Sequence, residues 1–224
     1  MWELYTRAAD IGEAYDVFID GVLAMSSDQR HSEQPLAEYA ITPWQGRDDI
    51  NVLVAGMGMG HVVRAVLDTP GVARVDVVEV SRAILDWEKS HFTRLNGGAM
   101  QDPRVHVHHA ELSEFLAARA AMDASVPAEG WFAIILDLDE WPTTVTRPGN
   151  EKFYSDLGLE MLEAALRPGG VLGIWTTQKD DALLARLGLH LQNPTKVAVP
   201  VDRDGASVLD HMYRARRGPK KPVN

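Results

Sequence analysis

Three glycines alternate with two methionines directly after a run of apolar residues, in the segment VLVAGMGMGH. Glycine allows positive φ angles and lets a ligand approach the backbone closely. A carboxylate, Glu79, ends the next apolar run, where it can accept hydrogen bonds from the hydroxyls of a ribose. The pattern indicates a nucleoside site, and its first predicted residues are those of the turn: Gly56, Met57, Gly58, Met59 and Gly60.

The residues between and after the glycines favour one kind of nucleoside. A dinucleotide fingerprint, GxGxxG, requires a third glycine at position 61, where this chain has His61. A nucleoside sulfonium has no pyrophosphate to place on a helix N-terminus, so apolar Met57 and Met59 are acceptable walls for it. We predict S-adenosylmethionine or its decarboxylated form as the cofactor, with NAD or a flavin dinucleotide as the alternative, and we expect Val80 and Ala110 in the same site.

A second group of chemically useful residues follows the apolar segment WFAIIL. Asp137 can take a proton from a substrate ammonium or hydroxyl, or can orient an amine for attack. Asp139 lies on the same side if the strand continues, because side chains alternate across a strand. These two residues are the catalytic candidates. An acidic strand end facing water and a magnesium or calcium site are the alternatives.

Other residues are candidates for the acceptor site or for a metal. Glu140, Trp141, His31 and Tyr154 occupy segments that are expected near the cofactor, so we predict substrate contacts for them. The segment HVHH would place two histidines on one strand face, but no third ligand is evident nearby. We therefore expect no metal site.

Alternating strand and helix patterns must position these residues. From residue 50 onward, apolar strands such as INVLVA and WFAIIL alternate with segments of helical periodicity. Near-continuous Val/Ile/Leu strands are typical of a parallel sheet that is covered on both faces. The expected fold is α/β, a Rossmann-like doubly wound sheet of seven mostly parallel strands, with a short N-terminal β-hairpin that turns at Asp20-Gly21.

Three segments are predicted from these patterns. Residues 1–45 form a β appendage and linker, residues 46–216 form the cofactor-binding domain, and residues 217–224 form a flexible basic tail. In such sheets ligands bind beyond the carboxyl ends of the strands, which is where the glycine turn and Asp137 are expected.

Composition excludes several classes of function. The 224 residues include no cysteine, which excludes disulfides, thiolate catalysis and thiolate metal sites. The net charge of −10 disfavours nucleic acid as a partner. The sequence shows neither an apolar run long enough to span a membrane nor a signal-peptide pattern, so we expect a cytoplasmic protein with a small-molecule acceptor and no membrane partner.

Five segments together resemble the spermidine synthase (polyamine aminopropyltransferase) family and its methyltransferase-fold relatives. They are GMGMG, VDVVEVS, LNGGAMQDPRVHVHHAELSEFL, FAIILDLDEWP and FYSDLGLEMLEAALRPGGVL. The resemblance covers roughly residues 15 to 176 and implies a class I methyltransferase fold and a homodimer. It also implies that Glu79 binds ribose, that Glu111 takes the place of an adenine-contacting aspartate, and that Asp137 is the first acid of the catalytic loop.

The chain departs from that family at three places. Met59 stands where the family usually has an acid that holds the cofactor's ammonium group, Ser32-Glu33 replaces a tyrosine-histidine pair, and the catalytic loop reads DLDEWP. These departures favour methyl transfer from S-adenosylmethionine to a small amine or hydroxyl as the main functional hypothesis. The alternatives are aminopropyl transfer from decarboxylated S-adenosylmethionine, attack by the cofactor's own amine or carboxylate, and an inactive nucleoside-binding partner subunit.

Overall fold

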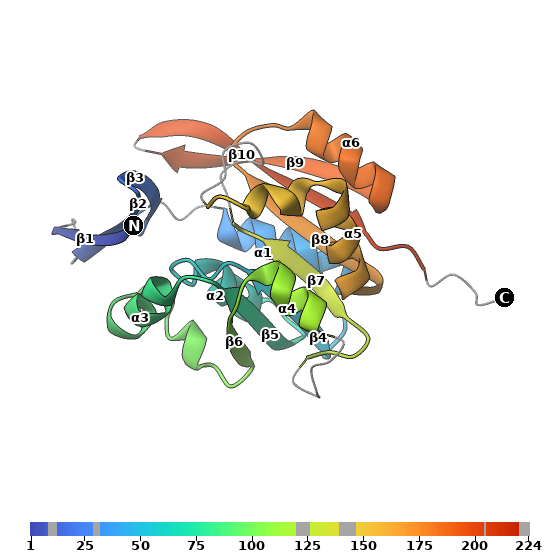
Figure 1. Cartoon of the computed structure of the whole chain (residues 1–224), viewed down its shortest axis with the longest axis horizontal. Coiled ribbons are helices and arrows are strands. Elements are labelled where there is room, and N and C mark those ends of the chain that lie inside the picture. The colour runs from blue at the N-terminus through green and yellow to red at the C-terminus, as the bar shows by residue number, and fades with distance from the viewer. Residues whose placement is uncertain (9–12, 29–31, 120–125, 139–146, 204, 220–224) are drawn as a thin grey trace.

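The computed structural model describes residues 1–8, 13–28, 32–119, 126–138, 147–203 and 205–219 (Figure 1). The strands are β1 (Trp2–Ala8), β2 (Glu13–Ile19), β3 (Val22–Ser26), β4 (Ile50–Ala55), β5 (Val72–Glu79), β6 (Val105–His109), β7 (Trp131–Leu136), β8 (Leu166–Thr176), β9 (Gln192–Arg203) and β10 (Ala206–Arg216). The α-helices are α1 (Glu33–Ile41), α2 (His61–Asp68), α3 (Arg82–Ser90), α4 (Leu112–Ala118), α5 (Asp156–Ala165) and α6 (Asp181–His190).

The larger sheet has seven strands in the order β6-β5-β4-β7-β8-β10-β9. The first five of these run parallel, whereas β10 pairs antiparallel with both β8 and β9. The chain order reverses between β4 and β7, and a crevice for a ligand forms at such a reversal. The expected α/β fold with a mostly parallel seven-stranded sheet is confirmed, and β9 and β10 close the sheet as an antiparallel pair.

The central strands form because both of their faces are buried. On β4, Val52 and Val54 point into one apolar cluster, whereas Leu53 and Ala55 point into the other. Helices α1, α2 and α3 contribute to the first cluster, and α4, α5 and α6 contribute to the second (Figure 1). This arrangement leaves the carboxyl ends of the parallel strands as the edge at which polar side chains can meet a ligand.

The N-terminal strands β1, β2 and β3 form a separate antiparallel sheet. Asp20 and Gly21 connect β2 to β3 with φ angles of 50° and 78°, as a two-residue hairpin turn requires. The predicted Asp-Gly turn is therefore confirmed, and β1 extends the expected hairpin to three strands. Met25 on β3 places its sulfur 3.8 Å from where a Cβ on Gly58 would lie, so this sheet reaches the glycine turn.

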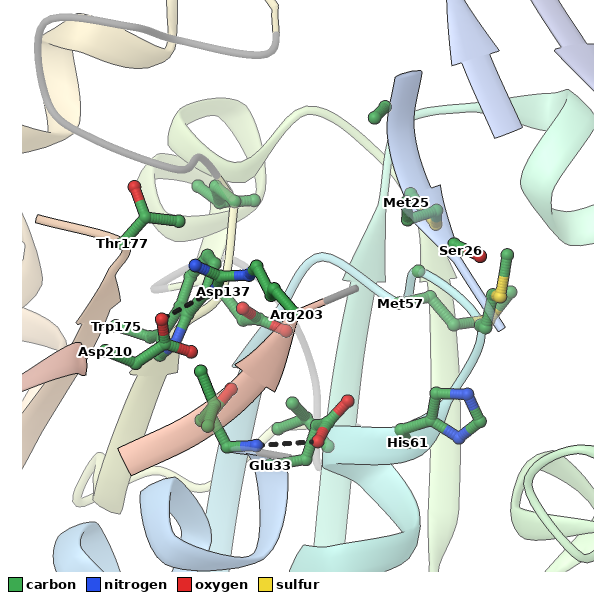
Figure 2. Close-up of a pocket in the computed structure, with 17 residues that line it drawn as sticks. Met25, Ser26, Glu33, Met57, His61, Asp137, Trp175, Thr177, Arg203 and Asp210 are labelled. Atoms are coloured by element: carbon green, nitrogen blue, oxygen red, sulfur yellow. Dashed lines mark hydrogen bonds and ion pairs between the residues drawn. The ribbon is translucent and has the colours of Figure 1, made fainter. Parts of the chain in front are cut away.

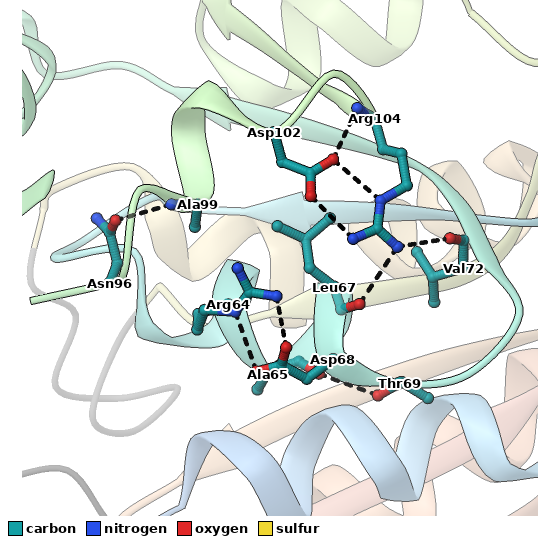
Figure 3. A network of polar contacts seen from close by, with 10 residues as sticks. All are labelled: Arg64, Ala65, Leu67, Asp68, Thr69, Val72, Asn96, Ala99, Asp102 and Arg104. Atoms are coloured by element: carbon teal, nitrogen blue, oxygen red, sulfur yellow. Dashed lines mark hydrogen bonds and ion pairs between the residues drawn. The ribbon is translucent and has the colours of Figure 1, made fainter.

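A polar network ties the end of α2 to the start of β6 (Figure 3). The Arg104 guanidinium donates to the Leu67 carbonyl at 3.3 Å and to the Val72 carbonyl at 3.0 Å. Asp102 binds the same guanidinium, and this hydrogen bonding lowers the pKa of Asp102 to about 2. The motif DPR therefore satisfies one carbonyl at the C-terminal end of α2 and one at the start of β5, and it ties the helix that follows the glycine turn to the next strand.

The described helices include none that is long and apolar enough to cross a membrane. The predicted tail begins at Arg217, whose N–H donates to the Gly170 carbonyl at 2.8 Å and whose guanidinium binds the Ala164 carbonyl at 3.1 Å. This residue is therefore tied to the main sheet. Residues 220–224 lie outside the described part of the chain.

Candidate functional site

Two adjoining pockets lie at the carboxyl ends of the parallel strands. The first has a volume of about 90 Å³ and is lined by Glu79, Val80, Ala110 and Glu111 among others. The second has a volume of about 190 Å³ and extends toward α1 and the β9-β10 hairpin. Four residues line both pockets: Met25, Gly58, Asp137 and Leu138.

The glycine turn between β4 and α2 separates the two pockets. Gly56 has a φ of +87°, and a Cβ there would lie 2.8 Å from the carbonyl oxygen of Asp137. Gly60 has a φ of +84°, and a Cβ there would lie 2.6 Å from the amide nitrogen of Asn96. A side chain at either position would be strained and would also collide with a neighbour. The turn therefore needs glycine even before a ligand is considered.

Asn96 stabilises the glycine turn through hydrogen bonds from its side chain. Its amide nitrogen donates to the Met59 carbonyl at 3.1 Å and to the Glu88 carboxylate at 2.8 Å. Its side-chain oxygen accepts from the Ala99 N–H at 3.0 Å. Asn96 is only 1% exposed, so these bonds are shielded from water. Neither Asn96 nor Glu88 is recognisable as a site residue from its local sequence.

Glu79 lies at the end of β5 and faces the first pocket, as predicted. Its carboxylate accepts hydrogen bonds from the Met57 N–H at 2.9 Å and the Ser81 N–H at 2.6 Å. The residue is 6% exposed, and burial raises the pKa of its carboxyl above the ordinary value, although the backbone N–H donors lower it. Glu79 thus joins the ends of two neighbouring strands and presents an acceptor to the pocket.

Ala110 and Glu111 follow β6 and form another wall of the first pocket. The Ala110 N–H donates to the Glu79 carbonyl at 3.1 Å, which continues the strand pairing to the pocket edge. Glu111 caps α4 by accepting from the Glu114 N–H at 3.1 Å, and it pairs with Lys152 at 2.9 Å. Burial opposes ionisation, but hydrogen bonds from Ser113 and Lys152 lower the pKa of Glu111.

The first pocket also contains residues that we did not predict. Trp2 of the N-terminal sheet lines it, together with Arg147, Asn150 and Phe153. Tyr154, a predicted substrate contact, instead lies 2% exposed in the apolar cluster beneath α5 and α6, and it is absent from the described lining of both pockets. The segment before α5 thus reaches the pocket through Asn150 and Phe153, and no local pattern distinguishes them from Tyr154.

Asp137 follows β7 directly and lies at the junction of the two pockets. Its N–H donates to the Ala55 carbonyl at 3.3 Å, so the backbone continues the β4-β7 pairing by one residue. The other predicted residues of this loop, Asp139, Glu140 and Trp141, lie outside the described residues, as does His31.

The second pocket has an apolar wall and an acidic one. Met57 and Met59 line it and are 3% and 4% exposed, and neither is among the described residues that line the first pocket. Glu33, the first residue of α1, accepts from the Ser32 N–H at 3.1 Å and lines the pocket from the opposite side (Figure 2). Glu33 stands at a position where the family resemblance implies a histidine.

Trp175, Arg203 and Asp210 form a polar group in the wall of the second pocket (Figure 2). Asp210 is 1% exposed, and its two oxygens accept from Trp175 Nε1 at 2.9 Å and from Arg203 Nη2 at 2.6 Å. The three residues lie on β8, β9 and β10. Neither Arg203 nor Asp210 could be identified from sequence, because only the antiparallel pairing brings them beside Trp175.

The histidines on β6 show no metal-site geometry. The His108 ring nitrogen Nε2 lies 2.9 Å from the buried carboxylate of Asp76, which also accepts from Arg74 and Trp131. Within the described ranges, no group of three or more metal-ligating side chains comes together.

Comparison with known proteins assigns the family. Residues 44–191 match the model of the spermine/spermidine synthase domain. The chain belongs to the spermine/spermidine synthase family. Two curated relatives are the polyamine aminopropyltransferase of Mycobacterium tuberculosis, 28% identical over 72% of this chain, and polyamine aminopropyltransferase 2 of Streptomyces coelicolor, 31% identical over 94% of it. The alignments cover only 28% and 37% of those relatives' own lengths.

Solved structures agree with the fold of this synthase-family chain. A spermidine synthase in complex with the transition-state analogue AdoDATO gives a TM-score of 0.75 at 16% identity, covering 98% of this chain and 71% of that one. Human methyltransferase-like protein 13 in complex with SAH gives 0.60 at 19% identity, covering 86% and 82%. The predicted likeness to both spermidine synthases and methyltransferase-fold proteins is confirmed.

The main functional expectation, methyl transfer, is wrong. The matching family model is a spermine/spermidine synthase domain, and both curated relatives are polyamine aminopropyltransferases. The expectation rests on Met59 in place of an acid, but one side chain in the turn does not set the charge of the pocket. Glu33 of α1 and Asp137 after β7 bring carboxylates to the same pocket. The broader prediction of a transferase agrees with the family.

Proposed function

We propose that this chain transfers an aminopropyl group from decarboxylated S-adenosylmethionine to the amine of a small acceptor. The observation that carries the proposal is the position of Asp137, which lines both pockets where they join. With the nucleoside in the first pocket and the acceptor in the second, this carboxylate lies where the reacting groups meet. The family and the names of the relatives support the same reaction.

The first pocket fits an adenine nucleoside. A carboxylate has about four acceptor positions, so Glu79 can bind ribose hydroxyls while it keeps its two backbone donors. Val80, Ala110 and Leu112 offer apolar surface to a purine ring, and Gly58 leaves open space beside Met25. The decarboxylated cofactor supplies a propyl carbon that is activated by the sulfonium leaving group.

The residues of the second pocket position the acceptor and receive its proton. The acceptor nitrogen forms a bond to the propyl carbon next to sulfur, the carbon–sulfur bond breaks, and its electron pair stays on sulfur in neutral methylthioadenosine. Asp137 accepts the proton that the nitrogen loses. Because the leaving group is already activated, orientation of the amine supplies much of the rate. The methionine walls keep water away from the reacting carbon.

The test incubates the protein with decarboxylated S-adenosylmethionine and putrescine and measures the released methylthioadenosine by chromatography. We expect release by the wild type and a kcat at least ~100-fold lower for Asp137→Asn, because this change removes the base. Asp68→Asn, an exposed acid at the end of α2, is the matched control and should retain full activity. If the wild type releases no methylthioadenosine with any acceptor of a diamine and amino-acid panel, the proposed reaction is refuted.

For the assembly and compartment of this enzyme, we propose a cytoplasmic homodimer. The family resemblance supports the dimer. Sedimentation of the full chain at a mass near twice 24.7 kDa would support it, and a monomer at the same concentration would refute it.

A further inference from the structure

Arg203 places a cation in the wall of a pocket that is meant to receive an amine. Its side chain reaches from the end of β9 into the second pocket, beside Asp210 (Figure 2). Nη2 donates to Asp210 at 2.6 Å, and within the described part of the chain this is the partner that the structure gives the guanidinium. An arginine carries five N–H donors, so several remain to bind a ligand.

Asp210 and Trp175 hold the guanidinium in place. Asp210 is nearly inaccessible to solvent, and Trp175 Nε1 fixes the oxygen that Arg203 does not contact. Because Asp210 is only 1% exposed and each of its oxygens binds a protein donor, this carboxylate supports Arg203 and offers little surface to a substrate ammonium. A rigidly held guanidinium matches the planar geometry of a carboxylate.

The second pocket carries charges of both signs among its described lining residues. Glu33 and Asp137 line the pocket as acids, and Arg203 lines it as a cation. Asp210 offsets the charge of Arg203, but the N–H groups that Asp210 does not bind can donate to a carboxylate and cannot bind an ammonium, which has no acceptor. A molecule with both an amine and a carboxylate satisfies the acids and the cation together.

We propose that the second pocket binds the carboxylate of an amino-acid moiety through Arg203, alongside the reacting amine. This inference rests on the proposed aminopropyl-transfer site. The moiety has two possible sources, an amino-acid acceptor such as ornithine or the methionine half of S-adenosylmethionine that has kept its carboxylate. In either case the acceptor nitrogen bonds to the carbon next to sulfur, the carbon–sulfur bond breaks, and neutral methylthioadenosine leaves.

Matched substrates that differ by one carboxylate test this inference. Ornithine is compared with putrescine as the acceptor for decarboxylated S-adenosylmethionine, and S-adenosylmethionine is compared with its decarboxylated form as the donor to putrescine. We expect methylthioadenosine release to favour the carboxylated member of one pair at least tenfold in kcat/KM. Arg203→Gln should reduce that ratio at least tenfold, and Arg203→Lys should reduce it less.

The control variant is Arg47→Gln, which removes an exposed arginine that is paired with Asp49 at the opposite end of β4. It should keep the wild-type ratio, and melting temperatures report whether each variant is folded. Preference for the uncarboxylated member of both pairs, unchanged in Arg203→Gln, would overturn the inference and leave the proposed function standing.

A binding measurement separates the two proposals if no pair reacts. Ornithine and putrescine are titrated by calorimetry into protein saturated with methylthioadenosine, and S-adenosylmethionine and its decarboxylated form into the protein alone. Tighter binding of a carboxylated member that weakens at least tenfold in Arg203→Gln supports the inference, even though the proposed reaction has failed. Equal affinities within both pairs overturn it.

Discussion

The two pockets are built in different ways. The first lies over the ends of β4, β5, β6 and β7, neighbouring strands of one sheet, and backbone hydrogen bonds from Met57, Ser81 and Ala110 hold its edge together. The second takes residues from β3, α1, β8, β9 and β10 as well as the glycine turn, and side chains such as Glu33 and Arg203 contribute its charge. Sheet topology thus builds most of the first pocket, to which Trp2 and Met25 of the N-terminal sheet are added, whereas the charged wall of the second pocket depends on elements outside the parallel core.

This difference has a consequence for specificity. The first pocket combines strand pairing with the Glu79 carboxylate, which accepts from the Met57 and Ser81 N–H groups, so single side-chain changes other than at Glu79 should leave its shape largely intact. A pocket whose charge comes from Glu33, Arg203 and Asp210 changes its preferred ligand when one of them changes. We therefore expect variants to separate nucleoside affinity from acceptor affinity, except at the residues that both pockets share.

The largest expected effect follows Gly56→Ala, which should impair both pockets at once. Its Cβ would collide with the Asp137 carbonyl, and Asp137 lines both. We expect stability to fall by about 3 kcal/mol, from backbone strain and displacement together, and both nucleoside affinity and kcat to fall at least tenfold. Urea unfolding, calorimetry with methylthioadenosine and the release assay measure the three quantities.

Gly21→Ala is the matched control for that variant. Gly21 has a φ of +78°, and nothing lies within 4 Å of a Cβ placed there. We expect only the backbone strain, about 1 kcal/mol, with nucleoside affinity and kcat unchanged. Equal losses of activity in the two variants would mean that the contact between Gly56 and Asp137 is unimportant.

Glu79→Gln should weaken the first pocket and spare the second. The glutamine places an NH₂ group near the Met57 and Ser81 N–H donors and removes a charged acceptor, which costs about 2 kcal/mol. Methylthioadenosine should therefore bind ~30-fold more weakly in calorimetry, while the acceptor KM stays within twofold. Glu129→Gln, an exposed acid before β7, should change neither value. A matching rise in acceptor KM would show that the pockets do not act separately.

Trp175→Phe should weaken ligand binding in the second pocket and spare the first. It removes the N–H that binds Asp210 and keeps most of the apolar ring, so the support of Arg203 weakens by about 1 kcal/mol. We expect the acceptor KM to rise ~5-fold and the methylthioadenosine Kd to stay within twofold. Trp44→Phe is the control, because Trp44 donates its own N–H to the Phe132 carbonyl at 2.9 Å and lines neither pocket within the described residues. An unchanged acceptor KM in Trp175→Phe would contradict the role of this group.

The smallest expected effect is the pH dependence of nucleoside binding. Burial raises the pKa of Glu79, and only its ionised carboxylate can accept hydrogen bonds from ribose hydroxyls at full strength. Affinity for methylthioadenosine should be constant at neutral pH and should decrease as pH falls through this raised pKa. Calorimetry at successively lower pH should show a loss of affinity for the wild type and none for Glu79→Gln. A loss of equal size in the variant would assign the titration to another group.

Some of the site could be predicted because neighbouring strands place their ends together. Gly58, Glu79, Ala110 and Asp137 each lie at or beyond the end of a strand, and strand order makes these ends adjacent. Tyr154 could not be separated from Phe153 in the same way. The two are adjacent aromatic residues in the same buried cluster, and only the packing of the segment before α5 brings Phe153 to the pocket lining as well.

The periodicity of apolar residues and the glycines at special backbone positions were enough to predict the strands and helices of the main sheet, because these elements depend on residues close along the chain. The charge of the second pocket could not be predicted from local sequence patterns. Arg203 and Asp210 reach the pocket only because the β9-β10 hairpin folds back beside β8. Glu33 reaches it because α1 packs against β8. Contacts between distant segments have no local signal, since the energy that selects them comes from burial of the whole core.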